Sequence, residues 1–124
     1  MSETRLTKDC PFVVSYVEAM LRFTTDFMDE SSDNALDWLY GSDHISEEMW
    51  VEVLDDCSGF LGEVGHLIKE EDIYQAGKDF WLTKQGIFNG FREGNWEHGA
   101  KLSEWAKTFR GNDPMPRDDG FLYF

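Results

Sequence analysis

Apolar side chains recur at steps of three and four through the middle of the chain, the spacing of an amphipathic helix. Ser46 precedes this pattern and is a good N-cap residue. Glu47 and Glu48 follow it, where a helix dipole favours negative charge. The pattern predicts a helix over about 47–69, with these residues on one stripe: Trp50, Val53, Leu54, Cys57, Leu61, Val64 and Ile68.

Three further segments are predicted to be helical. Pro11 suits a first helical position, and the apolar spacing behind it predicts an amphipathic helix over about 11–29. After a polar break at 29–34, a short helix is expected to end at Gly41, with these apolar residues: Leu36, Trp38 and Leu39. Asn95 is the expected cap of a helix over about 96–109, with these residues inward: Trp96, Leu102, Trp105, Ala106 and Phe109.

The C-terminal half contains segments that are typical of strands. Residues 79–83, Asp-Phe-Trp-Leu-Thr, predict one strand, and residues 87–91 predict its return partner in a hairpin. Residues 121–124 predict a final short strand. The expected fold is one α+β domain over residues 1–124, in which N-terminal helices pack with a small antiparallel sheet. This sheet is the hairpin plus the C-terminal strand, and the helix at 96–109 crosses it.

Glycines and cysteines in the predicted core lead to two smaller expectations. Gly59, Gly62 and Gly65 recur at every third residue, and each costs about 1 kcal/mol relative to Ala inside a helix. Either the helix breaks near Ser58, or these glycines line a seam of close packing, which we favour. The N-terminus has no apolar signal segment, so the distant Cys10 and Cys57 are expected to be reduced core thiols.

Negative charge is concentrated in one block of the sequence. The chain has 25 acids and 11 bases, a formal net charge of −14. Residues 23–72 contain fifteen acids and one base, Lys69, whereas acids and bases balance on either side of this block. Such a surface repels nucleic acid and anionic membranes. It favours a cationic partner, although an acidic face that only keeps the protein in solution remains an alternative.

The acidic residues have a spacing that could imitate DNA. On a helix, those from Glu48 to Glu63 would lie mostly opposite the apolar stripe and would span about 22 Å. Phosphates along one DNA strand are separated by about 3.4 Å of axial rise. We expect a basic partner to bind the following carboxylates: Asp26, Asp29, Glu30, Asp33, Asp37, Asp43, Glu47, Glu48, Glu52, Asp55, Asp56 and Glu63.

Motifs of catalysis and metal binding are not found in the sequence. There is no HExxH or GxSxG motif and no zinc-finger spacing of Cys and His. A calcium loop that begins at Asp29 would need Gly and Glu where the chain has Asn34 and Tyr40. We therefore expect no catalytic residues, no cofactor and no bound metal.

Residues 76–91 read AGKDFWLTKQGIFNGF, and they are followed by Leu102, Ala106, Asp119-Gly120 and Tyr123. The stretch from Ala76 to Phe124, about two fifths of the chain, resembles an uncharacterised family of small proteins from bacteriophages and mobile elements. The signature of that family reads approximately AGHDFWLTRNGHGAGFWD. Lys78 and Ile87 stand where the family tends to have His, and Lys84 stands where it tends to have Arg.

The resemblance implies a phage-type origin for this chain. Small acidic phage proteins resemble, as a class, inhibitors of host defence, including anti-restriction and anti-CRISPR proteins, several of which imitate DNA. The leading hypothesis is a non-enzymatic anti-CRISPR protein of the host cytoplasm that blocks the nucleic-acid channel of a basic host protein or ribonucleoprotein. The alternatives are a small phage adaptor or regulator that binds a host protein through an aromatic patch, and a small hydrolase or metal-dependent enzyme.

Overall fold

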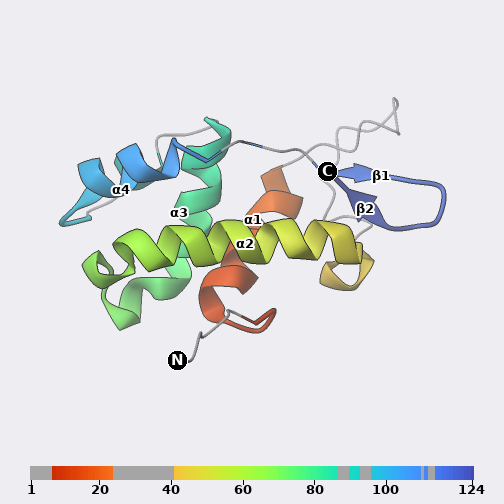
Figure 1. Ribbon diagram of the computed structural model, residues 1–124, viewed down its shortest axis with the longest axis horizontal. Coiled ribbons are helices and arrows are strands. Elements are labelled where there is room, and N and C mark those ends of the chain that lie inside the picture. The colour runs from red at the N-terminus through yellow and green to blue at the C-terminus, as the bar shows by residue number, and fades with distance from the viewer. Residues whose placement is uncertain (1–6, 24–40, 87–89, 93–95, 110, 112–113) are drawn as a thin grey trace.

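Helices form most of the described part of the chain, which in this computed structural model comprises residues 7–23, 41–86, 90–92, 96–109, 111 and 114–124 (Figure 1). Four α-helices are present there: α1 Pro11–Phe23, α2 Glu47–Val64, α3 Ile73–Gln85 and α4 Gly99–Ala106. Short 3-10 turns lie at Ser42–His44, Gly65–Leu67, Glu70–Asp72 and Gly90–Arg92. Two strands of two residues each, β1 Met115–Pro116 and β2 Leu122–Tyr123, follow near the C-terminus.

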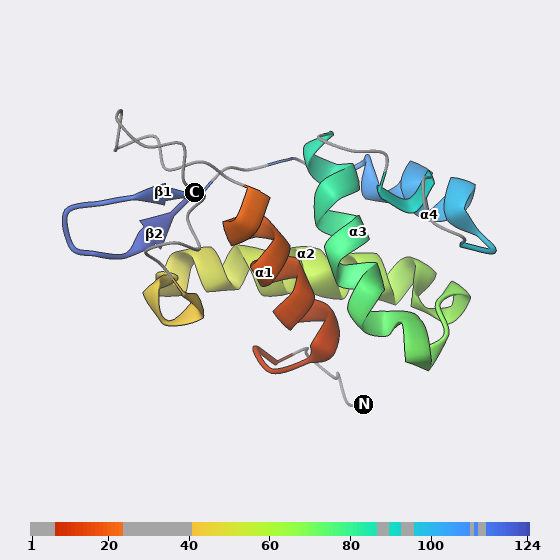
Figure 2. The same cartoon turned by 180° about the vertical axis from the view of Figure 1, so that it is seen from behind.

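The longest helix, α2, runs along the long axis of the molecule, and α1 and α3 cross it (Figures 1 and 2). The helix α4 lies beside one end of α2, and the two strands lie near its other end (Figure 1). The helices α1 and α3 pack closely because Gly77 has no side chain. A Cβ atom at Gly77 would overlap the carbonyl oxygen of Phe12 and the hydroxyl of Ser15.

The predicted central helix and its cap are confirmed in α2. The side chain of Ser46 accepts a hydrogen bond from the backbone N–H of Met49 at 3.2 Å, which satisfies one of the unpaired donors of the first turn. The helix ends at Val64, and Gly65–Leu67 continues as one 3-10 turn. The helix is therefore about one turn shorter than the sequence predicts.

Aromatic rings from three helices form the centre of the core. The rings of Phe60 and Phe80 stack with their centroids 4.2 Å apart, and Phe12 and Phe91 stack on this pair at 5.6 to 6.0 Å. The thiol of Cys57 is fully buried beside this core, whereas Cys10 is half-buried, and both are free cysteines. Cys57 is therefore a free core thiol as predicted, whereas Cys10 is free but only packs against the core.

The predicted antiparallel sheet is wrong. Residues 79–83 lie inside α3, and the described end of the expected return strand, Gly90 and Phe91, lies in a 3-10 turn. Residues 87–89 lie outside the described residues. The ribbon at the C-terminus pairs Met115 with Tyr123 and Pro116 with Leu122, and Leu122 also forms a single bridge with Ile45. The described part of the protein is thus a set of packed helices with one minimal ribbon, and not an α+β fold built on a sheet.

The reason for this error is the burial of α3 on nearly all sides. Contacts with α1 cover one side of α3, and contacts with α4 and the turn Gly90–Arg92 cover another. Its consecutive residues Asp79–Lys84 are all buried. An unbroken run of buried positions does not show helical periodicity, and a short run of this kind cannot be told from a strand by its pattern. Gly86, with a φ of 70°, then ends the helix in the left-handed conformation.

The predicted glycine seam in α2 is also wrong. A Cβ atom at Gly62 would meet nothing within 4 Å, and one at Gly65 would meet only Leu61 of its own helix. At Gly59 it would make an ordinary contact of 3.5 Å with Phe109. The helix does not break near Ser58. These glycines therefore face open space or loose packing, whereas the closely packed glycines of the described helices are Gly77 in α3 and Gly99 in α4.

The remaining predicted helices are found in part. The N-terminal helix begins at Pro11 as predicted, and its described part ends at Phe23. The helix predicted over 96–109 is shorter, at Gly99–Ala106, and its expected cap, Asn95, and the short helix before Gly41 lie outside the described residues. Within the described ranges, none of the helices combines the length and the apolarity that crossing a bilayer requires.

Candidate functional site

Exposed carboxylates form a row along α2 on the side opposite the core. Glu48, Glu52, Asp55 and Glu63 are all exposed, and we call these four residues the acidic face. The residues of the opposite side are buried: Met49, Trp50, Val53, Cys57, Phe60 and Val64. At a helical rise of about 1.5 Å per residue, the acidic face spans about 22 Å. The structure therefore brings together four of the acids that the sequence predicts to bind a partner.

Asp56 belongs to the predicted row but has a different role in the structure. Its carboxylate lies 2.6 Å from the ammonium nitrogen of Lys84 in α3. The side chain of Lys84 is only 1% exposed, and that of Asp56 is 28% exposed. The same ammonium group also donates a hydrogen bond to the hydroxyl of Tyr16 at 2.5 Å. Asp56 therefore neutralises a buried cation of the protein itself and does not belong to the acidic face.

Two further predicted acids lie at the start of α2. Glu47 is exposed in the first turn, and Asp43 has a side chain that is 86% exposed. Asp43 lies 3.4 Å from Nδ1 of His44, but this nitrogen already accepts a hydrogen bond from the backbone N–H of Gly41 at 2.9 Å. The other predicted acids lie outside the described residues: Asp26, Asp29, Glu30, Asp33 and Asp37.

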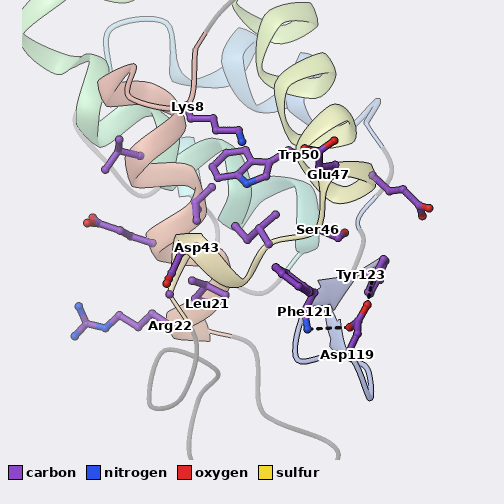
Figure 3. Close-up of a pocket in the computed structure, with 16 residues that line it drawn as sticks. Lys8, Leu21, Arg22, Asp43, Ser46, Glu47, Trp50, Asp119, Phe121 and Tyr123 are labelled. Carbon is purple, nitrogen blue, oxygen red and sulfur yellow. Dashed lines mark hydrogen bonds between the residues drawn. The ribbon is translucent and has the colours of Figure 1, made fainter.

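A pocket that the sequence does not reveal lies between α1, the start of α2 and the C-terminal ribbon (Figure 3). Its volume is about 1030 Å³. Leu21 from α1, Ile45 and Trp50 supply apolar wall, and Phe121 and Tyr123 line the opposite side. The backbone N–H of Ser46 donates to the carbonyl of Leu122 at 3.1 Å, which fixes the ribbon against the start of α2. The pocket is therefore built from three segments that are remote in sequence.

The lining of this pocket carries more negative than positive charge. Five carboxylates and two cationic side chains line it: Glu18, Asp43, Glu47, Glu48 and Asp119, with Lys8 and Arg22. The ammonium of Lys8 lies 4.8 Å from the centroid of the Trp50 ring. Asp119 accepts hydrogen bonds from the hydroxyl of Tyr123 at 2.5 Å and from the backbone N–H of Phe121 at 3.0 Å. The bond from Tyr123 lowers the pKa of Asp119, and it raises the pKa of Tyr123.

The residues that carry the phage-family resemblance have structural contacts. Asp79 is buried, and its carboxylate accepts hydrogen bonds from Nε1 of Trp96 at 2.8 Å and from the amide of Gln75 at 3.1 Å. The hydroxyl of Thr83 accepts a bond from the backbone N–H of Phe91 at 3.2 Å. Three aromatic rings of this segment are buried in the core: Phe80, Trp81 and Phe91. The segment therefore joins α3 to the following turn and to Trp96.

Side chains of the metal-ligating types do not converge in the described ranges. No group of three or more His, Cys, Asp or Glu residues there could hold a metal ion. Burial raises the pKa of Cys57 above its ordinary value of 9.0. Because the thiolate is the nucleophilic form of cysteine, this buried thiol is unsuited to nucleophilic chemistry.

No protein-family model matches this chain, and neither a curated protein nor a solved structure was found to match it. The acidic face and the pocket are therefore the features from which a function can be inferred.

Proposed function

We propose that this protein is a non-enzymatic inhibitor of a host defence complex, most specifically an anti-CRISPR protein that acts in the host cytoplasm. Its acidic face would occupy the nucleic-acid channel of a basic protein or ribonucleoprotein in place of DNA. The observation that carries this proposal is the row of four exposed carboxylates on α2, opposite a fully apolar buried side.

The dimensions of the acidic face suit a channel that binds phosphates. Its length of about 22 Å corresponds to roughly six phosphate steps on one DNA strand. Four carboxylates over this length imitate the charge of one strand only in part. The axial steps between the carboxylates are about 6, 4.5 and 12 Å, so they would meet some, but not all, of the lysines and arginines that neutralise phosphates in such a channel.

The energetics of α2 also favour a basic partner. Glu48 and Glu52 are four residues apart, and Glu52 and Asp55 are three apart. Like charges at these spacings destabilise a helix by a few tenths of a kcal/mol per pair. A cationic partner would relieve this repulsion, because it replaces like-charge neighbours by attractive contacts. The segregation of the net charge of −14 into residues 23–72 is consistent with a surface selected for binding.

The proposed phage-type origin rests on a signature whose described residues serve packing. The resemblance rests on residues such as Asp79 and Thr83, which hold α3 to its neighbours. A shared signature of this kind would preserve a scaffold, whereas the acidic face lies on a different helix. The inhibitory surface could therefore vary while the signature is retained.

The test is competition for DNA loading. Purified CRISPR effector complexes and restriction enzymes would be incubated with the protein, and binding of labelled duplex DNA would be followed by mobility shift. We expect the protein to block loading of at least one complex and excess duplex to restore it. The Glu52→Lys, Glu63→Lys variant should lose most of this inhibition. Inhibition that excess DNA does not relieve, or inhibition of none of the complexes, would contradict the proposal.

The matched control reverses two carboxylates outside the acidic face and so makes the same change in net charge. Glu97 and Glu104 are exposed, and they lie in the charge-balanced segment of the chain. Reversing both to Lys alters the net charge as much as the test variant does. We expect this control to inhibit DNA loading nearly as well as the unaltered protein. Equal losses in both variants would show that the overall charge, and not the acidic face, is responsible.

A second candidate function, an adaptor for a host protein, is supported by the pocket. The described aromatic residues of the signature, Phe80, Trp81 and Phe91, are buried and offer no surface patch. The pocket instead presents Trp50, Phe121 and Tyr123 beside α1 (Figure 3). The dependence of binding affinity on salt distinguishes the two functions. At physiological ionic strength dissolved ions screen contacts between exposed charges beyond about 8 Å, so binding through the acidic face should weaken as salt rises. Affinity that does not change with salt would favour the adaptor.

A further inference from the structure

The pocket beside α2 combines an apolar wall with a negatively charged rim, which few ligands match at once. Leu21 and Trp50 supply apolar wall and Glu47 stands at the rim (Figure 3). Ile45 and Glu48 also line the pocket. Its volume of about 1030 Å³ is at the upper end of the range for pockets that bind drug-sized molecules. It can therefore take more than one side chain of a partner protein.

Two aromatic rings that line the pocket each form a cation–π contact with a basic side chain of the protein itself. Lys8, which is exposed, lies over the Trp50 ring at 4.8 Å, and Arg117 lies over the Tyr123 ring at 4.1 Å. Contacts of this type are weak at exposed sites. A cation from outside could therefore replace Lys8 on the Trp50 ring.

The carboxylates at the rim are available for such a cation. Within the described part of the chain, Glu47 and Glu48 have no ion-pair or hydrogen-bond partner for their side chains. Both are exposed, and both belong to the first turn of α2, next to Ser46. A partner cation on Trp50 would thus meet a wall of the pocket that already carries unpaired negative charge.

We propose that this pocket binds a segment of a partner protein in which a Lys or Arg stands beside an apolar side chain. The apolar side chain would fill the wall formed by Leu21, Ile45 and Trp50. The basic side chain would displace Lys8 and lie between Trp50 and the carboxylates of Glu47 and Glu48. This inference deepens the proposed function and rests on it for the basic character of the partner, because it names the contact that would anchor such a partner.

The experiment uses short peptides as probes of the pocket in the full chain. The peptide Ac-Arg-Leu-Arg-NH2 would be titrated into ¹⁵N-labelled protein, and the resonances would be followed by NMR. We expect saturable shifts of the Trp50 indole N–H and of the backbone amides of Glu47 and Phe121. Ac-Arg-Gly-Arg-NH2 should bind roughly tenfold more weakly because it lacks the apolar side chain. Ac-Glu-Leu-Glu-NH2 should cause no saturable shift.

Matched variants separate the pocket from general attraction to an acidic helix. Glu47→Gln with Glu48→Gln, and Glu52→Gln with Glu63→Gln, each remove two charges from α2, but only the first pair lines the pocket. We expect the first pair to weaken peptide binding about tenfold and the second by less than about twofold. Lys8→Gln should strengthen binding about threefold because it removes the competing cation.

Several results would overturn the inference. Equal losses in the two double variants, weaker binding by Lys8→Gln, or saturable binding of the acidic peptide would each do so. Shifts of the pocket resonances with protein concentration alone would make a second copy of the chain the occupant. If the peptides do not bind but DNA loading is still blocked, the pocket proposal fails and the proposed function stands. If the peptides bind but DNA loading is not blocked, the proposed function fails and the pocket proposal stands.

Discussion

The ammonium nitrogen of Lys84 lies 2.6 Å from a carboxylate oxygen of Asp56, although 28 residues separate the two in the chain. The pair joins α3 to α2, and the bond from Lys84 to the hydroxyl of Tyr16 adds α1. Lys84 is almost fully buried. A buried cation is stable only when it is paired and hydrogen-bonded. The helices α1, α2 and α3 are therefore held together by two polar contacts of one ammonium group as well as by their apolar core.

Replacement of Lys84 by Ala should destabilise the fold strongly. The change leaves the carboxylate of Asp56 and the hydroxyl of Tyr16 without their partner. Breaking a buried pair costs about 3–5 kcal/mol, and the partial exposure of Asp56 places our expectation near the lower end, at about 3 kcal/mol. Urea unfolding followed by circular dichroism would measure the change in the free energy of unfolding.

Two controls accompany the Lys84 variant. Asp56→Asn retains an oxygen that can accept from Lys84, so its loss should be smaller. Lys101→Ala removes an exposed lysine of α4 and should change the free energy of unfolding by less than about 0.5 kcal/mol. A Lys84 variant as stable as the Lys101 variant would show that the buried pair contributes nothing.

Stability should fall at alkaline pH because of two buried acids. Burial raises the pKa of Tyr16 well above its ordinary value of 10.0, and it raises the pKa of Cys57 above 9.0. The folded state therefore keeps both protons when the unfolded state has lost them. These two groups should leave the free energy of unfolding unchanged between about pH 7 and about pH 8.5 and should lower it above that range. Each group adds a slope of about 1.4 kcal/mol per pH unit once its unfolded form is ionised.

The Cys57→Ala variant isolates one of these two groups. It should be less stable at neutral pH, because it leaves a small cavity in the core. Above about pH 10, however, its stability should fall less steeply than that of the unaltered protein, since the contribution of Cys57 is then missing and that of Tyr16 remains. Urea midpoints between pH 7 and about pH 11 would show both effects. An alkaline slope that is unchanged by the substitution would exclude a contribution from Cys57.

Sequence periodicity predicted α2 and its acidic face because both depend on one helix. The cap Ser46 lies only three residues before its partner, Met49. The apolar stripe and the carboxylates occupy opposite sides of the same helix. No contact with a distant segment is needed to place them. The start of α1 at Pro11 was predicted for the same reason.

The features that depend on distant contacts could not be predicted in this way. Asp56 looked like its acidic neighbours, and only the position of Lys84 in another helix gives it a different role. The helix α3 is covered by several elements, so its buried positions showed no period. The pocket needs α1, the start of α2 and the ribbon together, and none of these segments contains a signal for it.

Salt should raise the thermal stability of the protein. The net charge of −14 includes neighbouring carboxylates on α2 that repel one another. Ions screen this repulsion, and the Debye length falls to about 3 Å at 1 M. Between about 0.02 M and about 0.5 M NaCl we expect the melting temperature to rise by about 3–5 °C. Differential scanning calorimetry would measure it.

The charge-reversal variants assign this salt response to its source. Glu52→Lys with Glu63→Lys should melt at a higher temperature in low salt and should respond less to added salt. The same change at Glu97 and Glu104 should retain more of the response, since these residues lie outside the acidic block. A melting temperature that is independent of salt in the unaltered protein would show that carboxylate repulsion is negligible.

Two glycines in helices should respond in opposite directions to the same substitution. Gly77→Ala places a methyl group against the carbonyl oxygen of Phe12 and the hydroxyl of Ser15, so α1 and α3 must separate. We expect a loss of about 3 kcal/mol in the free energy of unfolding, as for overpacking that backbone atoms cannot relieve.

Gly62→Ala places the methyl group in open space and should stabilise the protein by about 0.5–1 kcal/mol, because alanine is the better helix former. Urea midpoints of the two variants would decide, with an unchanged m-value showing that the same amount of surface is exposed on unfolding. A Gly77 variant as stable as the unaltered protein would mean that α1 and α3 are not in close contact through this residue.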